Sequence, residues 1–195
     1  CGGLLGDLVP HRLHPLMLAS GKPEFPVRVM SIGTKAVHTD RLTPGTPERD
    51  VPEHVQLVAE FPSGYMVTIT TSTVNAKSPG FVIYGHKATL SVDEGGKSLE
   101  LVPERPFSEE VDPVKMSGLQ HEDIRVHEKN WFDCIRNGKQ PNANIDLAIK
   151  VQTVISLAEM SERLRSVCLF DEKTRKVTNG DGKTLQLTYG TLPLS

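Results

Sequence analysis

Three residues near the start of the chain have the types and the spacing that acid–base chemistry requires. In GDLVPHRLHPLM, residues 6–17, Asp7, His11 and His14 lie four and three positions apart. On a helix this spacing brings the three side chains to one face. A neutral imidazole at His11 can take the proton from a substrate hydroxyl, while the Asp7 carboxylate holds the ring and stabilises the imidazolium. If a hydride leaves the same carbon the result is alcohol oxidation, and His14 can hydrogen-bond a second hydroxyl of a polyol.

Two other interpretations of these residues remain open. Asp7 is a good N-cap for a helix with Pro10 in its first turn, and the two histidines can be ordinary half-buried side chains. As a metal site the three residues offer one oxygen and two nitrogen ligands, a set typical of divalent-metal sugar isomerases. No fourth ligand is evident, so we predict no metal site.

Composition and charge exclude several partner classes. The chain has 195 residues, 37% of them hydrophobic and 24% charged, with a net charge of −2. This balance lacks the basic footprint that nucleic acid or an anionic membrane would require. No apolar run approaches the ~20 residues of a membrane-spanning helix. We therefore predict a globular protein without nucleic-acid or membrane partners, and three scattered cysteines predict neither a disulfide framework nor a zinc ribbon.

The common nucleotide and hydrolase motifs are absent. The sequence contains no G-x-G-x-x-G, no H-E-x-x-H and no G-x-S-x-G. Gly96-Lys97-Ser98 and Gly182-Lys183-Thr184 lack the glycine that a P-loop places five residues earlier. The sequence therefore identifies no cofactor-binding residue in this chain.

The segments around these residues predict an α+β fold. Residues 3–20 predict an apolar helix that Pro15 should kink or end early. Runs rich in β-branched residues are joined by turns, so the sheet should be large, open and mostly antiparallel, with helices packed on one face. The predicted strands cover residues 27–38, 55–75 (a hairpin), 80–92 and 97–104.

The second half of the chain predicts a loop, two helices and a tail. Ile124, Trp131, Cys134 and Ile135 recur at helical spacing, which indicates a helix ended by Gly138. We expect Trp131 to lie in the core and Cys134 to be a buried thiol. We predict a loop over 105–120, helices over 122–137 and 144–165, a last edge strand over 166–171, and a polar tail over 173–195.

Several stretches in order resemble one family. GGLLGDLVPHRLHPLMLASG is similar to the start of the C-terminal domain in the glucose–fructose oxidoreductase/inositol dehydrogenase (Gfo/Idh/MocA) family, G-G-x-L-x-D-x-x-x-H-x-x-D/H. VQLVAEFPSGYMVTITTST resembles its hairpin, and FVIYGHKATLSVD resembles its I-x-G-x-x-G-x-L strand pair. HEKNWFDCIRNGKQP and the helix after it resemble the closing helices. The resemblance covers about residues 1–172, which we take as one substrate-binding and oligomerisation domain.

The resemblance implies a fold, a cofactor and partners. Members pair an N-terminal Rossmann domain with a C-terminal domain built on a large open sheet, whose outer face often forms the subunit interface. The implied cofactor is NAD or NADP, bound by the N-terminal domain, and the implied substrate is a sugar, cyclitol or related polyol. Because the chain begins CGG rather than with Met, we expect it to be the C-terminal half of a larger enzyme. Without the Rossmann domain it should be inactive alone. The family's subunit interface implies that the protein is a homo-oligomer.

The resemblance also assigns residues. Asp7 and His11 match the family's Asp/His pair, with His11 as acid/base, and His14 matches a substrate contact that is often Asp. Gln120 and His121 match a region that borders the substrate cleft. Two alternatives stay open: a non-catalytic sugar-binding or dimerisation module of the same fold, and a metal-dependent sugar isomerase or lyase using Asp7, His11 and His14.

Overall fold

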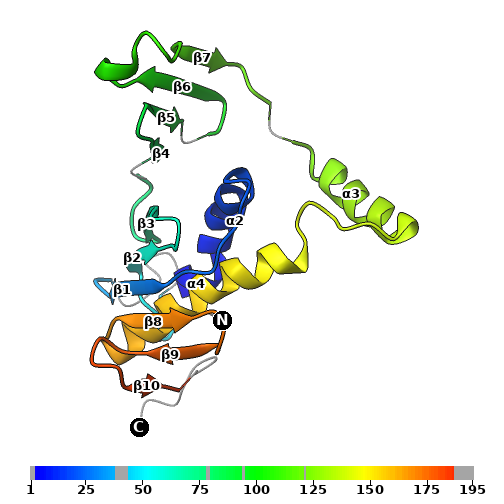
Figure 1. Cartoon of the computed structure of the whole chain (residues 1–195). Coiled ribbons are helices and arrows are strands. Elements are labelled where there is room, and N and C mark those ends of the chain that lie inside the picture. The colour runs from blue at the N-terminus through cyan, green and yellow to red at the C-terminus, as the bar shows by residue number, and fades with distance from the viewer. Residues whose placement is uncertain (1–2, 38–43, 78–79, 94, 121, 187–195) are drawn as a thin grey trace. The chain divides into compact units, whose positions relative to one another are not determined.

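The computed structural model describes residues 3–37, 44–77, 80–93, 95–120 and 122–186 (Figure 1). They divide into two compact units. Unit 1 takes in residues 1–76 and 143–195, and unit 2 takes in residues 77–142. The single structural domain expected over 1–172 is therefore interrupted, because the middle of the chain forms a sheet of its own.

Unit 1 contains a six-stranded sheet in the order β10-β9-β8-β1-β2-β3, with every neighbouring pair antiparallel. The predicted hairpin over 55–75 is confirmed as the β2–β3 pair. The strands are β1 (Arg28–Thr34), β2 (His54–Glu60), β3 (Met66–Ser72), β8 (Cys168–Asp171), β9 (Lys176–Thr178) and β10 (Thr184–Leu185).

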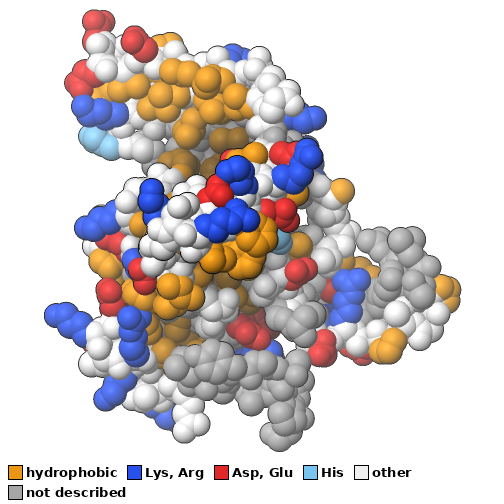
Figure 2. Space-filling view, turned by 90° about the vertical axis from the view of Figure 1, so that its right-hand side faces the viewer, with side chains coloured by type: hydrophobic (Ala, Val, Ile, Leu, Met, Phe, Trp, Pro, Cys, Tyr) orange, Lys and Arg blue, Asp and Glu red, His pale blue; other side chains and the backbone are white. Residues whose placement is uncertain are grey.

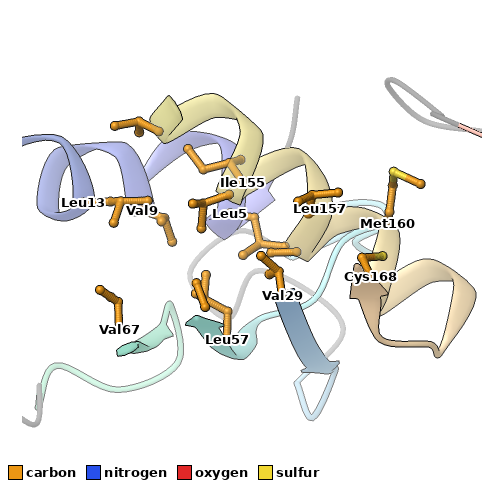
Figure 3. Packing of buried hydrophobic residues seen from close by; sticks show 14 of the residues in the cluster. Leu5, Val9, Leu13, Val29, Leu57, Val67, Ile155, Leu157, Met160 and Cys168 are labelled. Carbon is orange, nitrogen blue, oxygen red and sulfur yellow. The ribbon is translucent and has the colours of Figure 1, made fainter. Parts of the chain in front are cut away.

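Helices cover one face of this sheet. They are α1 (Gly3–Asp7), α2 (Val9–Ala19) and α4 (Ile145–Leu164). The long helix α4 packs against β1 and β8, α1 contacts β2, and α2 lies against α1 and α4. Figure 3 shows the apolar side chains of these helices meeting those of the strands in one layer, among them Leu5, Leu13, Val29, Leu57, Ile155 and Leu157.

The other face of the six-stranded sheet carries a mixed surface. Along β1 the side chains alternate between buried Val29 and Ser31 and exposed Met30 and Ile32, as expected for a sheet with one face on the core. Arg28 and Glu60 form an ion pair across this outer face, with 2.7 Å between Nη2 and Oε2.

Unit 2 contains a four-stranded antiparallel sheet in the order β4-β5-β6-β7. Its elements are β4 (Phe81–Tyr84), β5 (Ala88–Val92), β6 (Ser98–Pro103), the short 3-10 helix η1 (Arg105–Phe107), β7 (Val114–Ser117) and α3 (Ile124–Asn137). Both η1 and β7 lie in the segment 105–120, so the prediction of a loop there was wrong. Strand β7 has only four residues, so its own sequence does not predict a strand. Its hydrogen-bonded pairing with β6 makes it one.

Helix α3 has the predicted ends but only part of the predicted burial. The Asp123 carboxylate accepts a hydrogen bond from the Arg125 N–H at 2.9 Å, and Gly138 ends the helix with a φ of 62°. Trp131 is 53% exposed, so its expected core position was wrong, whereas Cys134 is buried as expected. Cys134 is the one buried residue among those described in unit 2.

The end of the chain also differs from the expectation. Residues 176–185 form β9 and β10, so a polar tail over 173–195 is wrong for this part, and β8 lies between β9 and β1 rather than at an edge. Residues 176–178 form a strand because Val177 is buried in the core while its polar neighbours point outward. Asn179 supports the intervening turn by accepting hydrogen bonds from the N–H groups of Asp181 and Lys183.

Candidate functional site

The candidate acid–base residues lie on one helical segment. Asp7 is the last residue of α1, and His11 and His14 are on α2. Leu8, between the helices, has φ −88° and ψ −35°, so the backbone stays helical and Asp7 and His11 are one turn apart. Side chains in this relation have Cβ atoms about 5–6 Å apart.

The buried side of the same segment fixes its orientation. Val9, Leu13 and Met17 recur every four residues and are at most 1% exposed. Their burial leaves Asp7 and His11 exposed and His14 half-buried. A side chain on Gly3 would place its Cβ 2.9 Å from the Val51 Cβ, and the φ of 55° also favours glycine there. The segment can therefore begin close against the chain that precedes β2.

Pro15 does not end the helix, contrary to one of the two outcomes expected. Helix α2 continues to Ala19. Pro15 is exposed, so water can reach the His11 carbonyl oxygen, which loses its helical N–H partner to the proline. One missing hydrogen bond at the surface is a small cost beside the burial of Leu13 and Met17.

Asp7 does not act as a helix cap. The N-cap of α2 is Leu8, and no side-chain hydrogen bond caps this helix. No hydrogen bond or ion pair joins Asp7 to His11 in the part of the chain that the structure describes. The Asp7 carboxylate is therefore exposed to solvent one helical turn from the His11 imidazole, and it does not cap α2.

The metal interpretation finds no support in the donor geometry. Among the described residues, no three His, Cys, Asp or Glu side chains gather as a candidate ligand set. Asp7, His11 and His14 share a helix face but do not converge on one point.

The other candidate residues belong to unit 2. Gln120 is exposed, and its Nε2 donates to the Gly118 carbonyl oxygen at 3.5 Å. His121 lies outside the described residues. A shallow hollow in unit 2 includes Lys115, which pairs with Glu100 at 3.5 Å. It contains none of the predicted site residues; it is lined by Ser91, Val92, Asp93, Ser98, Leu99, Glu100 and Lys115.

Sequence reasoning missed one buried charged group. Glu53 is 1% exposed, and its Oε2 accepts hydrogen bonds from the N–H groups of Ala36 and Val37 at 2.8 and 2.7 Å. Its carboxylate therefore holds the chain that leaves β1. The partners are 16 and 17 residues away, so no local sequence pattern signals this role.

Comparison with solved structures shows the fold. The chain matches UDP-N-acetylglucosamine 3-dehydrogenase GnnA from Acidithiobacillus ferrooxidans with a TM-score of 0.64, at 15% identity, over 83% of this chain and 48% of that one. It matches an NAD-binding protein from Listeria innocua with a TM-score of 0.64, at 14% identity, over 86% and 51%. It matches the aldose-aldose oxidoreductase from Caulobacter crescentus, complexed with glycerol, with a TM-score of 0.58, at 18% identity, over 81% and 45%.

The chain spans about half the length of these solved structures. A search of curated proteins finds no match. The α+β architecture with open antiparallel sheets is confirmed. The segment that carries Asp7, His11 and His14 lies within the stretch that matches a family model. Residues 1–91 match the model of the GFO/IDH/MocA C-terminal domain.

Proposed function

We propose that this chain is the substrate-binding and oligomerisation half of an NAD(P)-dependent oxidoreductase that acts on a sugar, cyclitol or related polyol. The observation that carries the proposal is the exposed Asp7–His11 pair, held one turn apart on a helical segment inside a GFO/IDH/MocA C-terminal domain. Two of the structural matches are named for sugar substrates and one for NAD binding. These names support the substrate class without fixing the substrate.

The proposed chemistry of this chain is proton transfer and positioning. His11, as a neutral imidazole, accepts the proton of the substrate hydroxyl that is oxidised. Asp7 stabilises the imidazolium so formed, because a carboxylate near a histidine favours its charged form. His14, three residues further along the helix, contacts a second hydroxyl. The rigid anchoring of Val9, Leu13 and Met17 keeps these groups in place.

The nicotinamide cofactor is proposed to be held by a separate nucleotide-binding domain. The residues of this chain do not fit a dinucleotide, because the sequence has no glycine-rich strand–turn–helix fingerprint. When bound to such a domain, the cofactor supplies the hydride acceptor. The proposal therefore predicts a coding sequence ahead of Cys1 with that fingerprint.

Replacing His11 tests the proposed role. In the longer protein, His11→Gln keeps a polar side chain of similar reach but removes the titratable imidazole. We expect kcat/KM for polyol oxidation to fall roughly a hundredfold to ten-thousandfold, the usual contribution of general acid–base catalysis. Dinucleotide affinity, measured by fluorescence titration, should stay unchanged.

The matched control is Arg12→Gln on the same helix. Arg12 is exposed and is the neighbour of His11 on another side of α2, so its loss should leave kcat/KM within about twofold of wild type. Equal activity of the His11 variant and wild type would overturn the assigned role. Polyol binding without turnover in the wild-type protein would favour the non-catalytic module instead.

A further inference from the structure

Asp7 and His11 lie one turn apart but are held in unit 1 by different anchors. His11 is on α2, which buries side chains of its own in the core. Asp7 is the last residue of α1, which has five residues and buries Leu4 and Leu5. A helix this short is not stable by itself. The position of Asp7 therefore depends on what α1 packs against.

Contacts at the surface are too weak to set that position. Figure 2 shows charged side chains of both signs close together on one face of the molecule. Ion pairs between exposed side chains contribute little, because water screens them and both side chains lose freedom. Asp7 is exposed, so its place must come from the packing of α1 against the chain beneath it.

Helix α1 begins against Val51, on the chain that enters β2. A Cβ atom on Gly3 would lie 2.9 Å from the Val51 Cβ and 3.1 and 3.2 Å from the two methyl carbons of Val51. Carbon atoms that are not bonded prefer about 3.5–4.0 Å, so glycine is the residue that lets α1 lie this close. Gly6, on the same helix, has nothing within 4 Å of the place where its Cβ would be.

The residues after Val51 are fastened to the six-stranded sheet. Pro52 packs on Gly33 of β1, where an added Cβ would lie 2.5 Å from the Pro52 Cγ. The Glu53 carbonyl oxygen accepts a hydrogen bond from the Thr73 N–H, just after β3, at 2.9 Å. Val51 is therefore held in place by the residues that follow it.

The buried Glu53 carboxylate adds a third attachment. Its Oε2 accepts the hydrogen bonds from Ala36 and Val37, which follow β1. Arg49 lies beside the other oxygen, with 3.9 Å between Nη1 and Oε1. Hydrogen bonds to a charged group are stronger than neutral ones. Residues 51–53, which we call the support segment, are thus tied to both neighbouring parts of the chain.

We propose that Val51 is a positioning residue that sets the place of Asp7 relative to His11 by supporting the start of α1. This role rests on the proposed function and adds to it a residue that acts through Asp7. The Leu8 N–H donates to the Leu4 carbonyl oxygen at 3.1 Å, so α1 continues into α2 and a shift at its start reaches Asp7. Because Asp7 stabilises an imidazolium that forms during the reaction, its placement affects kcat more than substrate binding.

Amide hydrogen exchange of this chain tests the placement without substrate. Val51→Ala removes the two methyl groups on which α1 rests. We expect the Leu8 amide, which joins the two helices, to exchange about fivefold faster, because local opening becomes easier. The Leu13 and Met17 amides should keep their rates, since α2 keeps its own anchors. Gly6→Ala is the matched control and should not speed exchange at Leu8.

Steady-state kinetics of the longer protein separates positioning from a general loss of structure. Val51→Ala and Gly3→Ala should each lower kcat about tenfold and leave KM within about twofold, because a misplaced catalytic group costs rate. After Asp7→Asn, Val51→Ala should lower kcat no further, since two changes that act through one group are not additive. Gly6→Ala should keep kcat within about twofold, because alanine suits a helix and fills open space there.

Two results would contradict the role of Val51. Equal exchange of the Leu8 amide in wild type and Val51→Ala would show that Val51 does not hold α1. An equal loss of kcat from Val51→Ala with and without Asp7→Asn would show that the loss does not pass through Asp7. An inactive wild-type protein with the expected exchange pattern would contradict only the proposed reaction.

Discussion

At the scale of single residues, burial separates the proposed site residues from side chains that hold the fold. Asp7 and His11 are exposed, so both can meet a substrate. Cys168 is fully buried, and burial raises the pKa of its thiol to about 11. At neutral pH this cysteine is a protonated core side chain.

Partial burial of Glu162 on α4 changes the pKa of its carboxyl group, and this effect can be tested. Its side chain packs beside Gly33 and Pro52, close enough that its Cγ would lie 3.1 Å from a Cβ on Gly33. Loss of hydration raises the pKa of this carboxyl above its usual 4.5, and Glu159 adds to the rise, while Arg163 and Arg165 oppose it. The neutral form of Glu162 is therefore more favoured in the folded protein than in the unfolded chain.

Replacing this residue should stabilise the protein in a pH-dependent way. As pH rises through 4.5 toward the folded-state pKa, the unfolded chain releases the proton first, so wild-type stability declines. Glu162→Gln stays neutral and should raise Tm at pH 7, with little change near pH 4. Thermal unfolding followed by circular dichroism measures both, and exposed Glu172→Gln is the control. A lower Tm for Glu162→Gln at pH 7 would contradict this reasoning.

At the scale of elements, helix α4 organises unit 1 and depends on its first turn. The Asn144 side chain accepts a hydrogen bond from the Leu147 N–H at 3.0 Å. This cap satisfies one of the N–H groups that lack a partner within the helix. Leu147 itself is buried, so the cap holds the helix where the core begins.

Removal of the Asn144 cap should cost about 1 kcal/mol of unfolding free energy. The measurement is urea denaturation of Asn144→Ala beside wild type. Asn142→Ala serves as control, because the Asn142 side chain makes no hydrogen bond within the described residues. Equal stability of wild type and the Asn144 variant would show that the cap contributes nothing.

Elements with strong periodicity could be predicted from the sequence, and those formed by pairing could not. The stripe of α4 and the alternation of β2 and β3 predicted these elements correctly. Strands β7, β9 and β10 have two to four residues each, so only their neighbours define them. Exposure of Trp131 could not be predicted either, because periodicity shows an apolar face without showing what packs on it.

The candidate site follows the same division. Spacing alone predicted that Asp7 and His11 share a helix face, because four residues make about one turn. Spacing did not exclude Asp7 as a cap, and the structure assigns that position to Leu8. The long-range contacts of Glu53 lay beyond any local pattern.

At the scale of the whole molecule, the described residues form two separate compact units. The chain spans about half of the solved structures that it matches. Within the described residues, no helix is both long and apolar enough to cross a membrane.

One measurement tests the central claim most directly: nicotinamide reduction by the longer protein, beside the 195-residue chain, with NAD or NADP and a panel of sugars and polyols. The account predicts that the longer protein binds a dinucleotide and reduces it with at least one polyol, whereas the 195-residue chain does neither. Failure of the longer protein to bind any dinucleotide would contradict the account and limit the family relationship to the fold.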